Sequence, residues 1–199
     1  MNRKALIYDI ETLATNPFNC VLVSMAALVF DIKTLERAEY DYESLVELAN
    51  FQKYNVEDQV KNYNRKIDPD TLDWWKEQGK EAIKKLKPSD EDVSITEAMR
   101  LLTSLIVENN IDYVFTRNNS FDPVIIRSIS EATGIPMPYG WWKIRDTKSF
   151  IMGLTYEMDI RDDFIPPGLE GKFIKHDPRH DIAMDIMRLQ TILHAKMSD

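Results

Sequence analysis

Cysteine is nearly absent from this sequence, since Cys20 is the one cysteine among 199 residues. A lone cysteine cannot form an internal disulfide, and no C-x-x-C pair or cysteine–histidine cluster suggests a structural zinc site. Long hydrophobic runs are missing as well, and the first residues, MNRKALIYDI, soon meet charge. We therefore expect neither a secretory signal nor a membrane span, but a soluble protein of a reducing compartment, the cytoplasm.

Basic residues are fewer than acidic ones: 25 lysines and arginines stand against 33 aspartates and glutamates, for a net charge of −8. This balance disfavours a protein that coats nucleic acid through bulk electrostatics. It leaves room for an enzyme that holds nucleic acid locally, especially where metal ions offset clustered carboxylates. The sequence also lacks internal repeats and low-complexity segments, and its length and 44% hydrophobic content suit one domain over residues 1–199.

The segment KALIYDIET predicts a strand with apolar residues on both faces. Leu6, Tyr8 and Ile10 lie on the face opposite two carboxylates, and a further isoleucine lies beside those carboxylates. Such a pattern is typical of a central strand covered by helices. Cys20–Phe30 is rich in Val and Leu and Arg37–Val46 alternates, so a three-strand meander is predicted.

The rest of the sequence alternates between predicted helices and short strands, which favours an α/β fold with a mixed sheet. Helix signals include an Asp-Pro start, a Gly stop, and apolar residues at i, i+3, i+4 and i+7. The predicted order is a helix at Asp68–Gly79, a helix at Pro88–Asn110, a strand at Ile111–Thr116, a helix at Phe121–Gly134, a strand at Trp141–Thr147, a loop at Arg161–Pro178 and a helix at Arg179–Lys196.

Asp9 and Glu11 interrupt the first apolar strand, where an unpartnered buried carboxylate would cost several kcal/mol. Residues two apart in a strand point to the same face, so both carboxylates can reach one metal ion or a pair of ions. The alternative is an ordinary solvent-exposed strand end.

Two further aspartates lie where a predicted strand meets a helix. Asp122 precedes Pro123 and has the residue pattern of a helix cap, but it also lies near the carboxyl end of a strand, where α/β folds place ligands. Asp146 ends a short strand and is interpreted as a cap of the next helix or a residue that supports the site.

The start of the last predicted helix holds His176, His180, Asp181 and Asp185 within ten residues. Asp181 and Asp185 are four residues apart and can share a helix face. His180 and Asp185 are five apart, so they converge only if His180 lies on the loop that enters the helix. A single histidine is more often a surface or core residue than a catalytic one, but two histidines and three aspartates together at a helix start make a functional site an equal alternative.

Taken in order, these residues resemble the DEDDh group of 3′–5′ exonucleases. The matching positions are Asp9 and Glu11 in the first strand, Asp122 at a helix start, and His180 and Asp185 in a His-x4-Asp arrangement, with His176 as a second histidine nearby. The resemblance implies a ribonuclease-H-like fold, in which helices flank a mixed central sheet of about five strands. It also implies two Mg²⁺ or Mn²⁺ ions and removal of nucleotides from 3′ ends.

The segment Thr71–Ser94 resembles the exonuclease A group of T-even bacteriophages, with its paired tryptophan, Lys-x-Gln and Pro-Ser-Asp-Glu-Asp-Val-Ser. This resemblance implies a bacteriophage enzyme in the host-cell cytoplasm that acts on single-stranded DNA. The alternatives are an exoribonuclease acting on short RNA or RNA 3′ ends, and a catalytically silent domain that binds a protein. A homodimer is compatible with any of these.

The catalytic hypothesis assigns the two metal ions to Asp9, Glu11, Asp122 and Asp185, because hard oxygen ligands suit Mg²⁺ and Mn²⁺. Two such ions stabilise the attacking and leaving oxygens of phosphodiester hydrolysis. His180 is the expected general base, since the ordinary pKa of histidine suits proton transfer near neutral pH.

Substrate contacts are expected from four residues near these motifs. Leu13 follows the Asp-x-Glu pair, and the family resemblance implies that it wedges against the terminal base. Adjacent aromatics on a helix cannot both face the core, so Trp74 is a candidate for stacking on a base. Asn119 and Phe121 lie within the three residues before Asp122 and are expected to contact the substrate.

Overall fold

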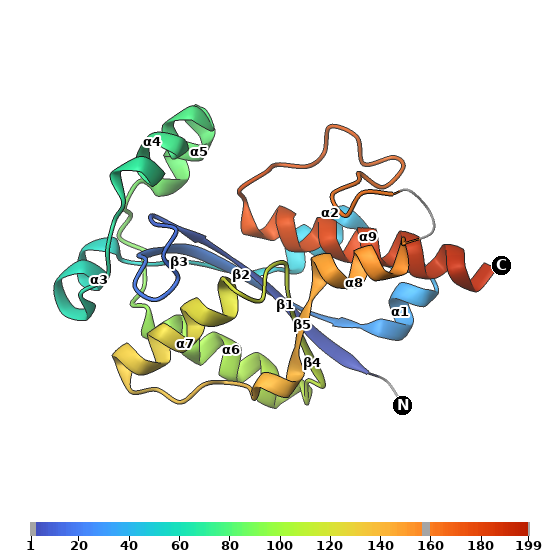
Figure 1. Cartoon of the computed structure of the whole chain (residues 1–199), viewed down its shortest axis with the longest axis horizontal. Coiled ribbons are helices and arrows are strands. Elements are labelled where there is room, and N and C mark those ends of the chain that lie inside the picture. The colour runs from blue at the N-terminus through green and yellow to red at the C-terminus, as the bar shows by residue number, and fades with distance from the viewer. Residues whose placement is uncertain (1–2, 157–159, 199) are drawn as a thin grey trace.

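The structure is a computed structural model that describes residues 3–156 and 160–198, without the side chains of residues 80–82 and 197–198. Five strands form one mixed sheet in the order β3-β2-β1-β4-β5 (Figure 1). β2 pairs antiparallel with β1 and β3, whereas β4 pairs parallel with β1 and β5. The predicted α/β class and the count of about five strands are confirmed. The strands are β1 (Lys4–Thr12), β2 (Leu22–Asp31), β3 (Asn50–Lys53), β4 (Tyr113–Thr116) and β5 (Ile144–Asp146).

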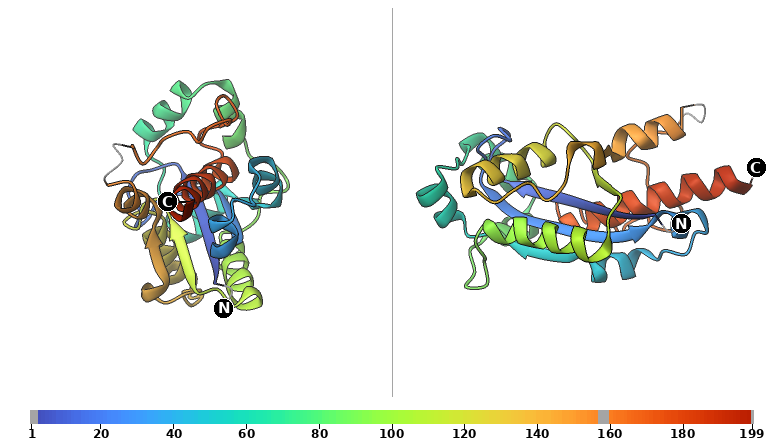
Figure 2. Two further views of the ribbon diagram at one scale, coloured as in Figure 1. Left: turned by 90° about the vertical axis from the view of Figure 1, so that its right-hand side faces the viewer. Right: turned by 90° about the horizontal axis from the view of Figure 1, so that it is seen from below.

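Helices cover both faces of the sheet (Figures 1 and 2). α6 (Thr96–Asn109) and α7 (Asp122–Thr133) cover one face, and α9 (Pro178–Ser198) crosses the other. Within residues 3–156 and 160–198, no helix has the length and hydropathy that crossing a membrane requires. The remaining elements are α1 (Ile32–Glu36), α2 (Tyr42–Leu48), α3 (Val56–Tyr63), α4 (Pro69–Glu77), α5 (Lys80–Leu86), the 3-10 helix η1 (Trp141–Lys143) and α8 (Thr147–Leu154).

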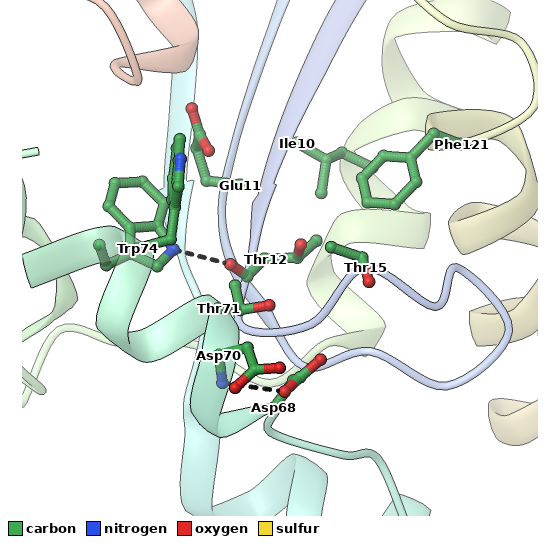
Figure 3. Close-up of a pocket in the computed structure, with 10 residues that line it drawn as sticks. Ile10, Glu11, Thr12, Thr15, Asp68, Asp70, Thr71, Trp74 and Phe121 are labelled. Carbon is green, nitrogen blue, oxygen red and sulfur yellow. Dashed lines mark hydrogen bonds between the residues drawn. The ribbon is translucent and has the colours of Figure 1, made fainter. Parts of the chain in front are cut away.

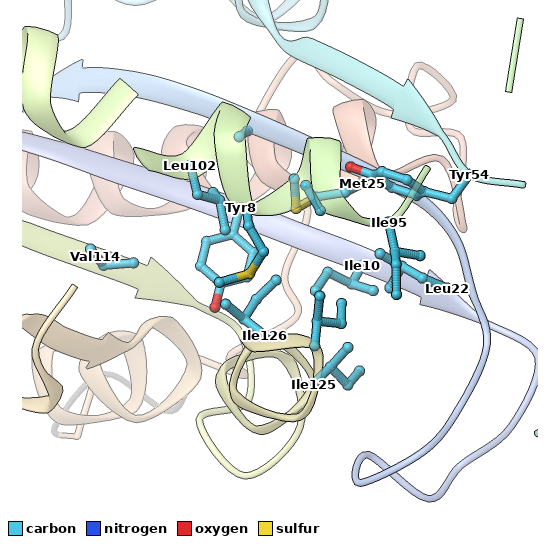
Figure 4. Packing of buried hydrophobic residues seen from close by; sticks show 14 of the residues in the cluster. Tyr8, Ile10, Leu22, Met25, Tyr54, Ile95, Leu102, Val114, Ile125 and Ile126 are labelled. Atoms are coloured by element: carbon cyan, nitrogen blue, oxygen red, sulfur yellow. The ribbon is translucent and has the colours of Figure 1, made fainter. Parts of the chain in front are cut away.

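β1 lies in the middle of the sheet, and its side chains alternate between two hydrophobic clusters. Leu6, Tyr8 and Ile10 pack against α6 and α7, as Figure 4 shows for Tyr8 and Ile10. Ala5 and Ile7 pack in the second cluster with α9. Because side chains alternate along a strand, the two carboxylates of β1 lie on the α9 face, as predicted. The partners of these carboxylates therefore come from α9 and the loop before it.

The predicted strand at Arg37–Val46 is wrong, because this segment begins with the C-cap of α1 at Arg37 and continues into α2. Tyr42 and Leu45 are three residues apart and both buried, which is the spacing of a helix. In so short a segment, the sequence pattern alone does not distinguish a helix from a strand. The Asp41 side chain also accepts a hydrogen bond from the Ser44 backbone N–H, which caps α2. The meander itself exists, and β3 is its third strand.

Two other predicted elements begin later than expected. α6 starts at Thr96, because Val93 instead lies extended beside Tyr54 and donates its backbone N–H to the Lys53 carbonyl. The predicted strand at Trp141–Thr147 opens with the turn of η1 before β5. The helix at the paired tryptophans begins where expected, since the Asp68 side chain caps α4.

The paired tryptophans of α4 have different surroundings, as expected for adjacent helical residues. Trp75 is 2% exposed and Trp74 is 40% exposed. The Trp75 indole N–H donates a 3.0 Å hydrogen bond to the Thr12 carbonyl, and its ring packs against Val21 and Val23. Trp75 thus attaches α4 to the end of β1.

Substitution at these two positions should have very different effects on stability. Trp75→Ala removes a buried ring and its hydrogen bond, so the free energy of unfolding should fall by about 3–5 kcal/mol. Trp74→Ala, the matched control on the same helix, should cost less than about 1 kcal/mol, because the ring is partly exposed. Urea unfolding of both variants measures the difference, and equal losses would contradict the assignment of Trp75 as the anchor.

Candidate active site

Three carboxylates meet at the end of β1. Asp9 and Glu11 of β1 and Asp181 of α9 each offer a ligand oxygen, and these oxygens lie within 4.8 Å of one another. Asp122, at the start of α7, lies on the other side of the strand end and accepts a 3.1 Å hydrogen bond from the Ile10 backbone N–H. Asp9, Glu11, Asp122 and Asp181 are called the acid cluster below.

Burial and mutual repulsion raise the pKa of every carboxyl in the acid cluster. Burial, and next the charge of Asp185, raise the pKa of Asp9 from 3.8 to about 7. Burial and then the charge of Asp9 raise the pKa values of Glu11, Asp122 and Asp181 well above their ordinary values. Among the described residues, no lysine or arginine forms an ion pair with this cluster.

The donor set of the acid cluster fits a hard divalent cation. Asp181 Oδ2 is buried and has no hydrogen-bond partner in the described part of the chain. An unsatisfied buried carboxylate oxygen is costly, and a cation removes that cost while it also offsets the repulsion from Asp9 and Glu11. Carboxylate oxygens alone, without sulfur or clustered imidazole ligands, suit Mg²⁺ or Mn²⁺.

Asp185, which the sequence hypothesis assigned to a metal ion, has different partners. Its buried carboxylate accepts hydrogen bonds of 2.5 Å from Arg117 and 2.7 Å from Arg188. Burial raises the pKa of Asp185, and these two guanidinium groups act against that effect. The structure therefore brings Asp181, and not Asp185, into the group of oxygens around Asp9 and Glu11.

The two histidines at the start of α9 also lie in different surroundings. His176 Nδ1 is 3.8 Å from Glu11 Oε1, and the His176 ring meets Trp74 edge-on with a centroid distance of 4.8 Å. His180 Nδ1 instead shares a 2.7 Å hydrogen bond with the hydroxyl of Tyr42 on α2. His176 is thus the histidine beside the acid cluster.

The backbone of His176 has φ = 60°, in the left-handed region that is uncommon for residues other than glycine. Such strained residues concentrate at functional sites, where the surrounding structure holds them in place. The next residue, Asp177, is fixed by ion pairs of 2.8 Å with Arg179 and 3.1 Å with Lys85 of α5. These contacts hold the entry to α9 against the α4–α5 hairpin.

A cavity of about 460 Å³ opens directly beside the acid cluster (Figure 3). Glu11 lines it, and in the view of Figure 3 the ring of Phe121 lies on one side and that of Trp74 on the opposite side. Thr12 and Thr15 lie between them. The size and two aromatic walls suit a flat ring system with polar substituents.

The other expected substrate residues are placed unequally. Trp74 and Phe121 line this cavity, whereas Leu13 is 5% exposed and packs against Val21, Val23 and Trp75. Leu13 is therefore a core residue and does not line this cavity. The Asn119 backbone N–H donates a 3.0 Å hydrogen bond to the side chain of Asp146. Asp146 also caps α8, as the sequence predicted for this aspartate.

His176 and Asp181 have the same His-x4-Asp spacing as His180 and Asp185, four residues earlier. The resemblance selected the second pair, because the segment from His180 to Asp185 also contains an alanine, Ala183. The structure places His176 and Asp181 next to Glu11, so the spacing shared by the two pairs is the sequence signal for His176 and Asp181.

Residues 4–181 match the model of a protein family described as the 3′–5′ exoribonuclease Rv2179c-like domain. This match covers both His176 and His180 and ends at Asp181. The exodeoxyribonuclease of Enterobacteria phage T4 is 29% identical to this chain, over 96% of the chain and 89% of the relative.

Solved structures of exonuclease I from E. coli share the fold. Its complex with single-stranded DNA gives a TM-score of 0.57 at 14% identity over 100% of this chain, and its complex with a 5cy-dT13 oligonucleotide gives 0.60 at 14% identity. The chain spans 41% of the exonuclease I chains in these structures. The likeness confirms the predicted ribonuclease-H-like arrangement of the sheet.

The raised pKa of Asp9 leads to a prediction about stability and pH in the absence of divalent ions. A carboxyl whose pKa is higher in the folded than in the unfolded protein contributes stability that is complete below its unfolded pKa and is lost as pH rises through its folded pKa. The melting temperature should therefore fall by several degrees as pH rises from 3.8 to about 7.

Adding Mg²⁺ or Mn²⁺ at neutral pH should raise the melting temperature again, because the ions bind the folded state. Thermal unfolding with chelator and with ion measures both effects. Asp9→Asn should weaken the dependence on pH and on the ion together. A wild-type melting temperature that responds to neither would count against the acid cluster as a cation site.

Proposed function

Because this chain belongs to the Rv2179c-like family of 3′–5′ exoribonuclease domains, and is thus a 3′–5′ exonuclease and a hydrolase, we propose that it removes nucleoside monophosphates from the 3′ end of single-stranded DNA. The observation that carries the proposal is the group of oxygens of Asp9, Glu11 and Asp181 beside a cavity with aromatic walls. The phage relative, an exodeoxyribonuclease similar over nearly the whole chain, supports DNA. The description of the family as exoribonucleases supports the second candidate, an activity on RNA 3′ ends.

The acid cluster is assigned to divalent metal ions. Asp9, Glu11 and Asp181, with Asp122 on the other side of the strand end, would hold Mg²⁺ or Mn²⁺. When bound, such ions supply Lewis-acid stabilisation of the negative charge that develops during phosphodiester hydrolysis. The β1 backbone fixes the direction of two of these carboxylates, because its flanking side chains are buried in both hydrophobic clusters.

His176 is the proposed general base, in place of His180. It lies next to Glu11, and burial lowers the pKa of its imidazole, so the ring is neutral and able to accept a proton at neutral pH. A proton leaving an attacking water would move to His176, whose strained backbone holds the ring at the cluster. His180 serves α9 packing through its hydrogen bond to Tyr42.

The cavity between Trp74 and Phe121 is assigned to the 3′-terminal nucleoside. Both rings present apolar surface to a base, and stacking on aromatic side chains tolerates any base. Glu11 belongs to the cavity lining and to the acid cluster, so a nucleoside in the cavity would place its 5′ phosphate next to the metal-binding carboxylates.

Substituting each histidine in turn tests the assignment of the base. His176→Ala should lower kcat by about 10²–10⁴-fold, because general base catalysis is worth this much. His180→Ala, the matched control at the same helix start, should keep kcat near the wild-type value. Steady-state kinetics on a 5′-labelled single strand gives both numbers. The reverse ranking would restore His180 as the base.

The nucleic acid substrate is tested by comparing DNA and RNA single strands of one sequence, with Mg²⁺, with Mn²⁺ and with chelator. We expect a ladder of products that shortens from the 3′ end, higher kcat/KM on DNA, and no cleavage with chelator or in Asp9→Ala. A higher kcat/KM on RNA would select the second candidate. Complete inactivity of the wild type on both strands with Mn²⁺ would refute the proposed function.

A further inference from the structure

A second cavity of about 440 Å³ lies next to the first, on the other side of the start of α7. Two short segments contribute to both cavities. In the β1–β2 loop, Thr15 lines the first cavity and Phe18 the second; at α7, Phe121 lines the first and Pro123 the second. The two cavities are therefore neighbours, separated by the side chains of these two segments.

The second cavity has exposed aromatic rings at its edge. Phe18 and Trp141 are each 73% exposed, which leaves most of both rings in contact with water. Apolar surface of this kind commonly marks a binding site. Trp141 is the only tryptophan that lines this cavity among the described residues.

The Trp141 ring contacts the ring of Trp142. The two rings meet edge-on, with centroids 6.1 Å apart and an interplanar angle of 83°. The Trp142 ring also lies over Gly140, so closely that a Cβ atom there would be 2.3 Å from it. The absence of a side chain at Gly140 thus leaves room for the Trp142 ring beside Trp141.

The charge of the second cavity differs from that of the first. The first is lined by Glu11, Asp68 and Asp70, whereas no carboxylate lies among the described residues that line the second. Arg127 of α7 lines it, is exposed, and forms no ion pair with any described residue. An unpaired arginine is notable in a chain of net charge −8, because carboxylates are plentiful.

We propose that the second cavity binds the part of a single-stranded nucleic acid that lies 5′ of the cleaved bond, with bases stacked on Phe18 and Trp141 and a phosphate on Arg127. The inference rests on the proposed function, because it places the 3′ end of the same strand in the first cavity. Exposed rings and one cation match a strand whose unpaired bases and phosphates alternate. Paired bases could not stack there, so the site selects single strands over duplexes.

The test compares a long oligothymidylate with the p-nitrophenyl ester of thymidine 5′-monophosphate, whose single nucleoside occupies the first cavity. In the double variant Phe18→Ala/Trp141→Ala, kcat/KM on the long strand should fall by at least about 5- to 150-fold, since the stacking of one base alone is worth this much. Activity on the mononucleotide ester should stay at the wild-type value. Val107→Ala, an exposed apolar residue on α6, is the matched control and should leave both activities unchanged.

A binding measurement separates this inference from the proposed function. Fluorescence anisotropy of a labelled oligothymidylate, with chelator present, should show weaker binding by the double variant. Arg127→Ala should reduce the slope of log Kd against log salt by about one, which corresponds to the loss of one phosphate contact. Inactivity of the wild type on both substrates would refute the proposed function while the binding test still stands.

Three outcomes would overturn the inference. One is wild-type affinity for the long strand in the double variant. Another is an equal loss of activity on the mononucleotide ester and the long strand, which would place both rings at the catalytic centre. The third is tight binding of a duplex DNA that has no free end, if that binding is lost when Trp141 is substituted. Circular dichroism of the variants confirms folding in every case.

Discussion

The repulsion among the carboxylates of Asp9, Glu11, Asp122 and Asp181 is the constraint around which the structure is built. Folding buries each of these carboxyl groups next to the others, and burial and the neighbouring negative charges oppose its ionisation. Only a rigid scaffold keeps such groups together. β1 provides it, since apolar side chains on both of its faces are locked between α6, α7 and α9.

The charges of α9 are divided between two tasks. Asp185 is neutralised by Arg117 and Arg188, and Arg188 also donates to the carbonyls of Asp163 and Phe164. This buried network holds the long loop before α9 onto the helix. One turn earlier, Asp181 keeps an unsatisfied oxygen that points to the need for a cation. Neighbouring turns of one helix thus carry a neutralised carboxylate and the one proposed to bind a cation.

The sheet and the position of Asp9 and Glu11 could be predicted from the sequence, because the alternation along β1 is local and strong. The resemblance assigned the histidine and aspartate roles to His180 and Asp185, although His176 and Asp181 have the same spacing. The proposal that gives these roles to His176 and Asp181 rests on contacts with Glu11, Tyr42 and the arginines, which depend on tertiary structure and cannot be deduced from spacing. The mistaken strand at Arg37–Val46 failed for the same reason, since burial of Tyr42 and Leu45 against α9 overrides a weak alternating pattern.

The central claim is that Asp9, Glu11 and Asp181 form the metal-binding group of this exonuclease. Anomalous diffraction from crystals grown with Mn²⁺ tests it most directly. The account predicts a strong anomalous peak among the carboxylate oxygens of these three residues, with Asp185 still bound to Arg117 and Arg188. A peak at Asp185 with its arginines displaced, or no peak near Asp9 and Glu11, would contradict it.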